Sequence, residues 1–179
     1  MLYQDRQKCF NQPILASIAV VILCLILLVI STNSKIRQSP LSWQPSTQVV
    51  SNELLQTALQ QNISVSSDKT AIDEKKVLIL PIPSSGKGKL YIFDFNTAKL
   101  CGSGGCLYAV YTQSGKSVLS LLLDSRLPKG VSLFELDEGT RNGFNCLVVA
   151  QSNNEGVLRN RYCYEGRGFA KVNSWITKN

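Results

Sequence analysis

The stretch FNCLVVAQSNNEGVLRNRYCY, residues 144–164, contains two runs of β-forming residues on either side of a turn. The runs cover residues 144–151 and 157–164, and the residues SNNEG between them are typical of a hairpin turn. Each run also carries one cysteine. The stretch therefore predicts an antiparallel β-hairpin whose register decides whether the two cysteines meet.

Two registers of this hairpin are open. If residues 154–155 form a two-residue loop, Cys146 lies opposite Cys163 at a non-hydrogen-bonded position, close enough for a disulfide. If Gly156 instead forms a left-handed bulge, the register slips by one residue and Cys146 faces Tyr164. The slipped register has the more apolar face, so the two signals conflict.

Similar runs lie on both sides of the hairpin. Turn signals separate them: SSGKGK, QSGK and Asp137-Glu138-Gly139, which is interpreted as a turn between strands. We expect these further strands at residues 77–80, 90–96, 106–112, 117–123, 131–136 and 169–175. Seven or eight short strands indicate a mainly β domain over residues 76–179, with an antiparallel sheet that is sandwich-like or a curled meander.

The sequence CGSGGC, residues 101–106, is the most distinctive loop. Its glycines let the chain turn tightly, and the two cysteines can then approach to the distance that a disulfide needs. Four cysteines allow three pairings, and the favoured one joins Cys101 to Cys106 and Cys146 to Cys163. On this interpretation the loop is a staple for the fold.

Two ligand-binding alternatives for the cysteines and the loop stay open. Successive N–H groups of Gly102, Ser103, Gly104 and Gly105 can form a nest for an anion or contact a partner. All four domain cysteines could instead bind a metal, but their spacing departs from that of known zinc sites and the chain has no histidine. We therefore expect no metal and no cofactor, and no small-molecule ligand is implied.

An apolar run without charges covers residues 14–30. As a helix it spans roughly 25 Å, the short end of what crosses a bilayer. It is longer than the core of a signal peptide and lacks a good cleavage site, and a lipoprotein signal at Cys24 would need a small residue before it. The run predicts a transmembrane helix at residues 14–31.

The remaining segments are assigned around this helix. Residues 1–13 form a short tail, and residues 32–75 a stalk that contains a short helix at about 52–61, with Ser51 as its cap. The charges that flank the helix are nearly balanced, so the cysteines decide its orientation. Disulfides indicate an oxidising compartment, which predicts a cytoplasmic N-terminus and a periplasmic or extracellular domain in the inner or plasma membrane.

The net charge of +7 is concentrated in the domain, where residues 76–179 hold 13 lysines and arginines against 7 acidic residues. A basic domain beside a membrane tolerates anionic lipids or cell-wall polymers. A nucleic-acid partner is not expected, because that function requires a clustered basic stripe interleaved with aromatic residues.

The motif CGSGGC followed by LYAVY, with the later strand Cys-Leu-Val-Val, resembles a set of uncharacterised exported bacterial proteins that carry CGxGGC-type loops. The resemblance covers residues 90–165. It implies a location in the bacterial envelope and a small β domain. It supplies no activity, so no functional residue is carried over.

The absence of histidine removes the largest group of activities. Ser-His-Asp and Cys-His catalysis and histidine-containing metal sites are impossible within this chain. A serine with a lysine base remains, with three candidate patterns: Ser66 with Lys69, Ser84 with Lys87, and Ser125 ahead of Pro128. Paired carboxylates are a further route, and the candidates are Asp94, Asp124, Asp137 and Glu138.

Together these patterns favour a non-catalytic function. The chain is predicted to be a single-pass membrane protein whose domain binds a protein or cell-wall partner, or serves as a subunit of an envelope complex. A membrane-anchored hydrolase of the Ser/Lys type is one alternative. An exported inhibitor of a cell-wall hydrolase, acting through residues 101–106, is the other.

Overall fold

A computed structural model describes residues 41–63, 72–83 and 88–178. Residues 41–179 form one compact unit, and everything below concerns that unit. The predicted transmembrane helix at 14–31 lies outside the described residues, as do the serine–lysine patterns at 66–69 and 84–87. Within the described part of the chain, no helix has the length and apolar character needed to span a membrane.

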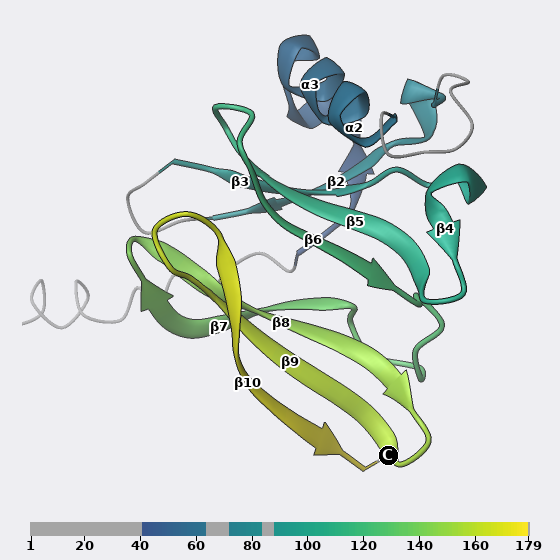
Figure 1. Cartoon of the computed structure of the whole chain (residues 1–179), viewed down its shortest axis with the longest axis vertical. Coiled ribbons are helices and arrows are strands. Elements are labelled where there is room, and N and C mark those ends of the chain that lie inside the picture. The colour runs from purple at the N-terminus through teal and green to yellow at the C-terminus, as the bar shows by residue number, and fades with distance from the viewer. Residues whose placement is uncertain (1–40, 64–71, 84–87, 179) are drawn as a thin grey trace, which may run out of the picture. The chain divides into compact units, whose positions relative to one another are not determined.

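The unit consists of two antiparallel sheets and a few helices (Figure 1). The first sheet has the order β1-β2-β3-β5-β4, with β6 paired to β5, and comprises β1 Gln44–Pro45, β2 Leu78–Ile82, β3 Leu90–Asp94, β4 Cys101–Gly102, β5 Gly105–Thr112 and β6 Ser117–Leu123. The second has the order β10-β9-β8-β7 and comprises β7 Phe134–Arg141, β8 Phe144–Asn153, β9 Gly156–Tyr164 and β10 Phe169–Thr177. The helices are α2 Ser46–Val49, α3 Asn52–Ile63 and the 3₁₀ turns Glu74–Lys76 and Ala98–Leu100.

The mainly β fold predicted from the sequence is confirmed, with the strands divided between two sheets. Of the strands in the described residues, eight have five or more residues, and each overlaps one predicted run. The helix expected at about 52–61 is α3, and the Ser51 hydroxyl oxygen accepts a hydrogen bond from the Leu54 N–H at 3.3 Å. Ser51 is thus the cap that the sequence predicts.

The prediction of a turn at Asp137-Glu138-Gly139 is wrong. These residues lie inside β7, where the register with β8 shifts between Leu136 and Thr140. The chain reverses at Asn142 and Gly143 instead, where positive φ angles of 52° and 84° match a type I′ hairpin turn. The acidic stretch is a bulge, and a Cβ at Gly139 would collide with Nη2 of Arg161.

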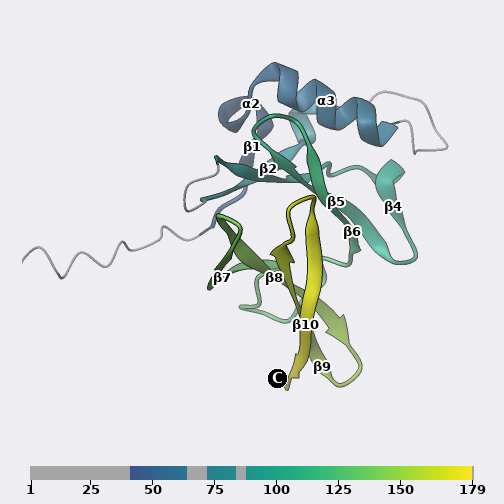
Figure 2. The ribbon, with the colours of Figure 1, turned by 60° about the vertical axis from the view of Figure 1, so that its left-hand side comes forward.

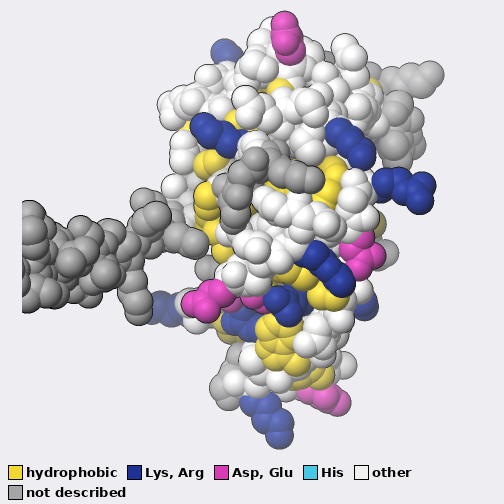
Figure 3. Space-filling view, turned by 90° about the vertical axis from the view of Figure 1, so that its left-hand side faces the viewer, with side chains coloured by type: hydrophobic (Ala, Val, Ile, Leu, Met, Phe, Trp, Pro, Cys, Tyr) yellow, Lys and Arg dark blue, Asp and Glu magenta, His cyan; other side chains and the backbone are white. Residues whose placement is uncertain are grey.

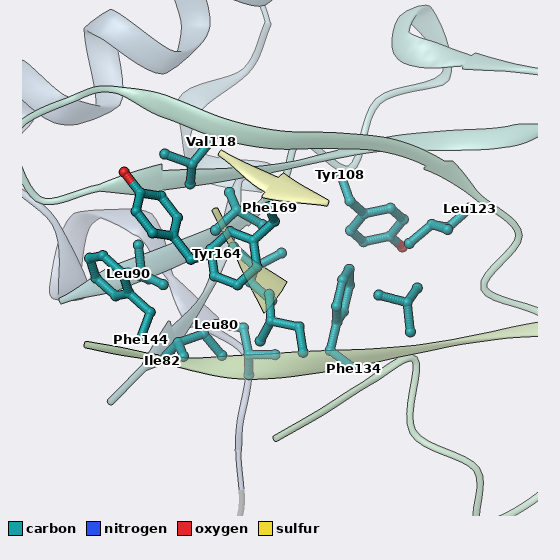
Figure 4. Close-up of a cluster of buried hydrophobic side chains, with 14 residues drawn as sticks. Leu80, Ile82, Leu90, Tyr108, Val118, Leu123, Phe134, Phe144, Tyr164 and Phe169 are labelled. Atoms are coloured by element: carbon teal, nitrogen blue, oxygen red, sulfur yellow. The ribbon is translucent and has the colours of Figure 1, made fainter. Parts of the chain in front are cut away.

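One core lies between the two sheets. Figure 4 shows side chains from both sheets pointing toward one another. The first sheet contributes Leu80, Ile82, Leu90, Ile92, Tyr108, Val110, Val118 and Leu123, and the second contributes Phe134, Phe144, Leu147, Val149, Tyr164 and Phe169. This shared core makes the fold a β-sandwich.

A second core covers the opposite face of the first sheet. Helix α3 lies over that face (Figures 1 and 2) and buries Leu54, Leu55, Ala58 and Leu59. The sheet residues beneath it are Val77, Ile79, Tyr91, Phe93, Phe95, Ala109 and Tyr111. Because β3 is buried on both faces, its sequence LYIFD is apolar almost throughout instead of alternating.

Neighbouring residues of β3 should both be essential for stability. Ile92 belongs to the core between the sheets and Phe93 to the core beneath α3. We expect Ile92→Ala and Phe93→Ala each to lower the free energy of unfolding by roughly 3 kcal/mol in urea titrations. Leu122→Ala, at a side chain that is 53% exposed, should change it by less than about 0.5 kcal/mol. A small effect at either β3 residue would contradict burial on both faces.

Candidate functional site

The glycine loop at residues 101–106 is a tight hairpin between β4 and β5. Cys101 pairs with Cys106 and Gly102 with Gly105, so Ser103 and Gly104 form the turn. A disulfide joins the two cysteines, with their Cα atoms 3.9 Å apart. The interpretation of the loop as a staple is confirmed. Its tip is exposed at Gly102, Ser103 and Gly104.

Among the glycines of the loop, Gly105 alone has a positive φ, of 109°. A Cβ at this position would overlap the backbone of Leu123 at the end of β6. Glycine is therefore required here for the close approach of two backbones, independently of any contact that the loop makes. The hypothesis that the loop N–H groups bind an anion stays a prediction.

The second disulfide confirms the register of the β8–β9 hairpin. Leu147 pairs with Tyr162 and Asn153 with Gly156, which places Cys146 opposite Cys163. Their Cα atoms are 4.4 Å apart, as in a non-hydrogen-bonded pair. The slipped register is wrong, although the face it would have created is more apolar, because the chain reverses in a two-residue loop. Since all four domain cysteines form disulfides, the four-cysteine metal site is also wrong.

The two disulfides differ in accessibility and in the loops that they close. Cys146 and Cys163 are 2% and 4% exposed, whereas Cys101 is exposed and Cys106 half-buried. The buried bond spans 17 residues and the exposed one 5. Loop-closure entropy then assigns about 3 kcal/mol of stabilisation to the buried bond and about 2 kcal/mol to the exposed bond.

A polar and aromatic cluster lies next to the exposed disulfide. Tyr108, two residues after Cys106 on β5, is the cross-strand partner of Asp94 on β3. Its ring lies 6.1 Å from that of Trp43 and 5.6 Å from that of Phe134, which comes from the facing sheet (Figure 4). Its hydroxyl group hydrogen-bonds with Asp94 and Ser125. We call Trp43, Asp94, Tyr108, Ser125 and Phe134 the Tyr108 cluster.

Burial changes the acidity of this cluster. Desolvation raises the pKa of Asp94, although hydrogen bonds from the Asn96 N–H at 2.8 Å and from Tyr108 lower it in part. Desolvation and the nearby Asp94 charge raise the pKa of Tyr108 to about 12. At the surface, hydrogen bonds from Arg126 hold the pKa of Asp124 at about 2.

The cluster brings together only part of the predicted catalytic sets. Asp94 hydrogen-bonds with Tyr108, and the charge of Asp124 also raises the pKa of Tyr108. Asp137 instead forms an ion pair with Arg161 on the second sheet. Arg126 donates to both oxygens of Asp124. The partner of Ser125 in this cluster is the Tyr108 hydroxyl group. Asp94 and Asp124 thus both influence Tyr108, Asp124 is paired with the exposed Arg126, and Asp137 is paired with Arg161 on the other sheet.

Sequence reasoning missed the surface of β10. This strand is an edge of the second sheet and pairs with β9 alone among the described strands. Residues 171–176 are all exposed. Three of the four large hydrophobic side chains exposed in the described residues lie on it: Val172 (40%), Trp175 (36%) and Ile176 (41%). Figure 3 shows exposed hydrophobic side chains in the lower part of the domain, with both basic and acidic side chains around them.

A signal for this edge was present in the sequence. The run FAKVNSWIT follows the β8–β9 hairpin directly, so a simple meander places it beside β9, and among the described strands β9 is its one neighbour. Its mixture of apolar and basic residues does not alternate cleanly, because the register with β9 shifts between Lys171 and Asn173.

No protein-family model matches this chain, and neither the curated proteins nor the solved structures contain a significant match. The function is therefore argued from the residues described above.

The Tyr108 hydroxyl should make stability depend on alkaline pH. Because its pKa is raised in the folded state, folding favours the protonated form, and this stabilisation is lost as pH rises from about 10 through about 12. We expect the wild type to lose roughly 2 kcal/mol more than Tyr108→Phe over that window in urea unfolding. Between about pH 6 and pH 9, where neither Tyr108 nor Asp94 titrates, the difference between the two proteins should be constant. If the unfolding free energies of the two proteins change with pH in parallel up to pH 12, the burial of this hydroxyl is contradicted.

Proposed function

We propose that this chain is a single-pass membrane protein whose β domain lies outside the cytoplasm and binds a partner without catalysing a reaction. The partner is a protein or a cell-wall component, and the domain binds it alone or as a subunit of an envelope complex. The observation that carries the proposal is the β10 edge, where exposed backbone and three exposed apolar side chains occur on one strand.

The location is supported by two features of the chain. The apolar run at residues 14–30 has the length of a short membrane span. Two disulfides within one small domain are typical of an oxidising compartment. An N-terminus in the cytoplasm and a domain in the periplasm or outside the cell satisfy both features.

Binding through β10 is supported by the composition of its surface. Three large apolar side chains are exposed within five residues of this strand, and such a local concentration marks interaction sites more often than isolated exposure does. Tryptophan is also among the residues that most often carry the binding energy of an interface. A nine-residue edge strand adds unpaired backbone groups, which extended segments of partner proteins can use.

A second surface supports the inhibitor alternative. Leu122, the fourth exposed large hydrophobic residue, lies beside Gly104 at the tip of the disulfide-closed hairpin. A closed, exposed hairpin loses little conformational entropy when it enters a cleft. If this hairpin enters the active-site cleft of a cell-wall hydrolase, the domain inhibits that enzyme through residues 101–106.

The proposed location predicts how cysteines react in intact cells. We expect a membrane-impermeant maleimide to label Cys101, Cys106, Cys146 and Cys163 only after reduction and unfolding of the protein from outside the cell. Mass spectrometry of the whole chain counts the added groups, and Cys9 is the internal control for an unlabelled cytoplasmic site. Labelling of the four cysteines only after lysis, without a reductant, would invert the topology and contradict the proposal.

The proposed binding surface is tested by site-specific photo-crosslinking in cells that make the protein. We expect a photoreactive amino acid at Trp175 to yield a crosslinked partner, whereas the same amino acid at exposed Lys116, in the β5–β6 turn, yields none. Crosslinks from Leu122 but not from Trp175 would favour the inhibitor alternative. The absence of crosslinks from every position on β10 and the loop would contradict a binding function.

A further inference from the structure

We infer that β10 takes up an extended, acidic segment of a partner protein as a fifth strand of the second sheet. The inference rests on the proposed function and specifies the chemistry of the partner. It follows from three properties of the edge: its regular backbone, its charge and the placement of its apolar side chains.

The backbone of β10 can accept another strand. Residues Asn173–Thr177 pair with β9 in an unbroken register of five residues, after the irregularity at Val172. At the opposite edge of the sheet, the register of β7 is broken between Leu136 and Thr140, and its acidic side chains pair with arginines of β9. Because bulges disrupt a ladder, β10 is the edge better suited to strand addition.

The charge of β10 is one-sided. From Gly166 to the end, the chain contains Arg167, Lys171 and Lys178 and no acidic residue. Within the described residues, none of these three cations forms an ion pair. The neighbouring acids are Glu165, which pairs with Arg141, and Glu155 in the β8–β9 turn. Lys171 within the strand, and Arg167 and Lys178 just beyond its two ends, therefore give the edge a net positive charge, while Asn173–Thr177 carry none.

The cations beside β10 on β9 do not add to this charge. Arg159 Nη1 lies 2.7 Å from Glu135 Oε2, and Arg161 Nε lies 2.7 Å from Asp137 Oδ2. The Nε–H of Arg161 is not aligned on an acceptor, but its Nη2 donates a hydrogen bond to Asp137 Oδ1 at 3.2 Å. Both arginines are neutralised, and the excess charge that a partner meets comes from Lys171 in β10 and from Arg167 and Lys178 on either side of it.

The apolar side chains lie between the cations. Lys171 and Lys178 flank Trp175 and Ile176, whose cross-strand partners on β9 are Arg159 and Leu158. Because successive residues of a strand point to opposite faces, Trp175 and Ile176 offer contacts on both faces of the sheet. A complementary segment has acidic residues at its ends and apolar residues in its centre.

A second copy of this chain is a poor occupant of the same edge. It would bring three further cations and no acid to the interface, and like charges across paired strands are destabilising. An acidic segment reverses the sign of that interaction and also accelerates association.

The test uses the full-length chain in a non-ionic detergent and fluorescence anisotropy of labelled nine-residue peptides. The acidic probe is Glu-Glu-Thr-Val-Ile-Val-Thr-Glu-Glu, and its matched control replaces every glutamate with lysine. We expect the acidic peptide to bind at least about tenfold more tightly than the basic one at low salt, with a smaller ratio at high salt. Methylation of the central backbone amides of the acidic peptide should abolish binding, because strand addition uses those groups.

Protein variants locate the site. The double variant Lys171→Glu and Lys178→Glu should lose at least about tenfold in affinity for the acidic peptide and gain affinity for the basic one. The matched double variant Lys116→Glu and Lys129→Glu has the same net charge and should bind like the wild type within about twofold.

Three results with the peptides would overturn the inference: equal binding of both peptides, equal effects of the two double variants, or unchanged affinity after amide methylation. Binding to phosphatidylglycerol vesicles is measured as well. If the β10 variant loses vesicle binding and keeps its affinity for the acidic peptide, the inference is also wrong. Salt-sensitive self-association through β10 would also overturn it in favour of a second copy. Crosslinks from Trp175 to a partner without an acidic segment would reject this inference and leave the proposed function intact. Failure of both crosslinking and peptide binding would reject both.

Discussion

Burial of both faces of the first sheet is the constraint on which the rest of the structure depends. Along β3, Ile92 belongs to the core between the sheets and Phe93 to the core beneath α3. A strand with no polar face must be covered on both sides. The second sheet supplies one cover and α3 the other, and this is why the segment before β2 is part of the domain. Trp43 and Leu41 also pack against the core between the sheets.

The two sheets are consequently unequal. The second sheet shares its inner face with the core, but within the described residues no helix covers its outer face. Val148 and Ala150 are buried there beside Arg161 and Arg159, their cross-strand partners, and the arginine charges are matched by acids of β7. The outer face of the second sheet is thus compact and nearly neutral, and the exposed apolar side chains of this sheet are concentrated at β10. The stable part of the domain and the edge proposed to bind a partner are therefore different parts of one sandwich.

Local patterns in the sequence predicted most of the strands. The β8–β9 hairpin and its disulfide follow from the spacing of two cysteines around a short loop, and β6 coincides with its apolar run. The bulge at Asp137-Glu138-Gly139 could not be predicted locally, because its glycine lies against the guanidinium group of Arg161 on another strand. The Asn142-Gly143 turn did have a strong local signal, which the acidic stretch obscured. The Tyr108 cluster and the exposure of β10 depend on which strands become neighbours, and that information lies in the packing of both sheets.

The basic side chains of the edge also reduce the tendency of an open sheet to pair with other copies of the chain. Unpaired backbone groups beside Trp175 and Ile176 would invite pairing between copies of the chain. Natural edges resist this with lysines and bulges, and β10 has both, at Lys171 and in the irregularity that follows it. Charges that repel a second copy attract a strand of opposite sign, so one pattern of residues can prevent self-association and select a partner. For this reason the side chains that keep the edge soluble are also the ones that would determine its specificity.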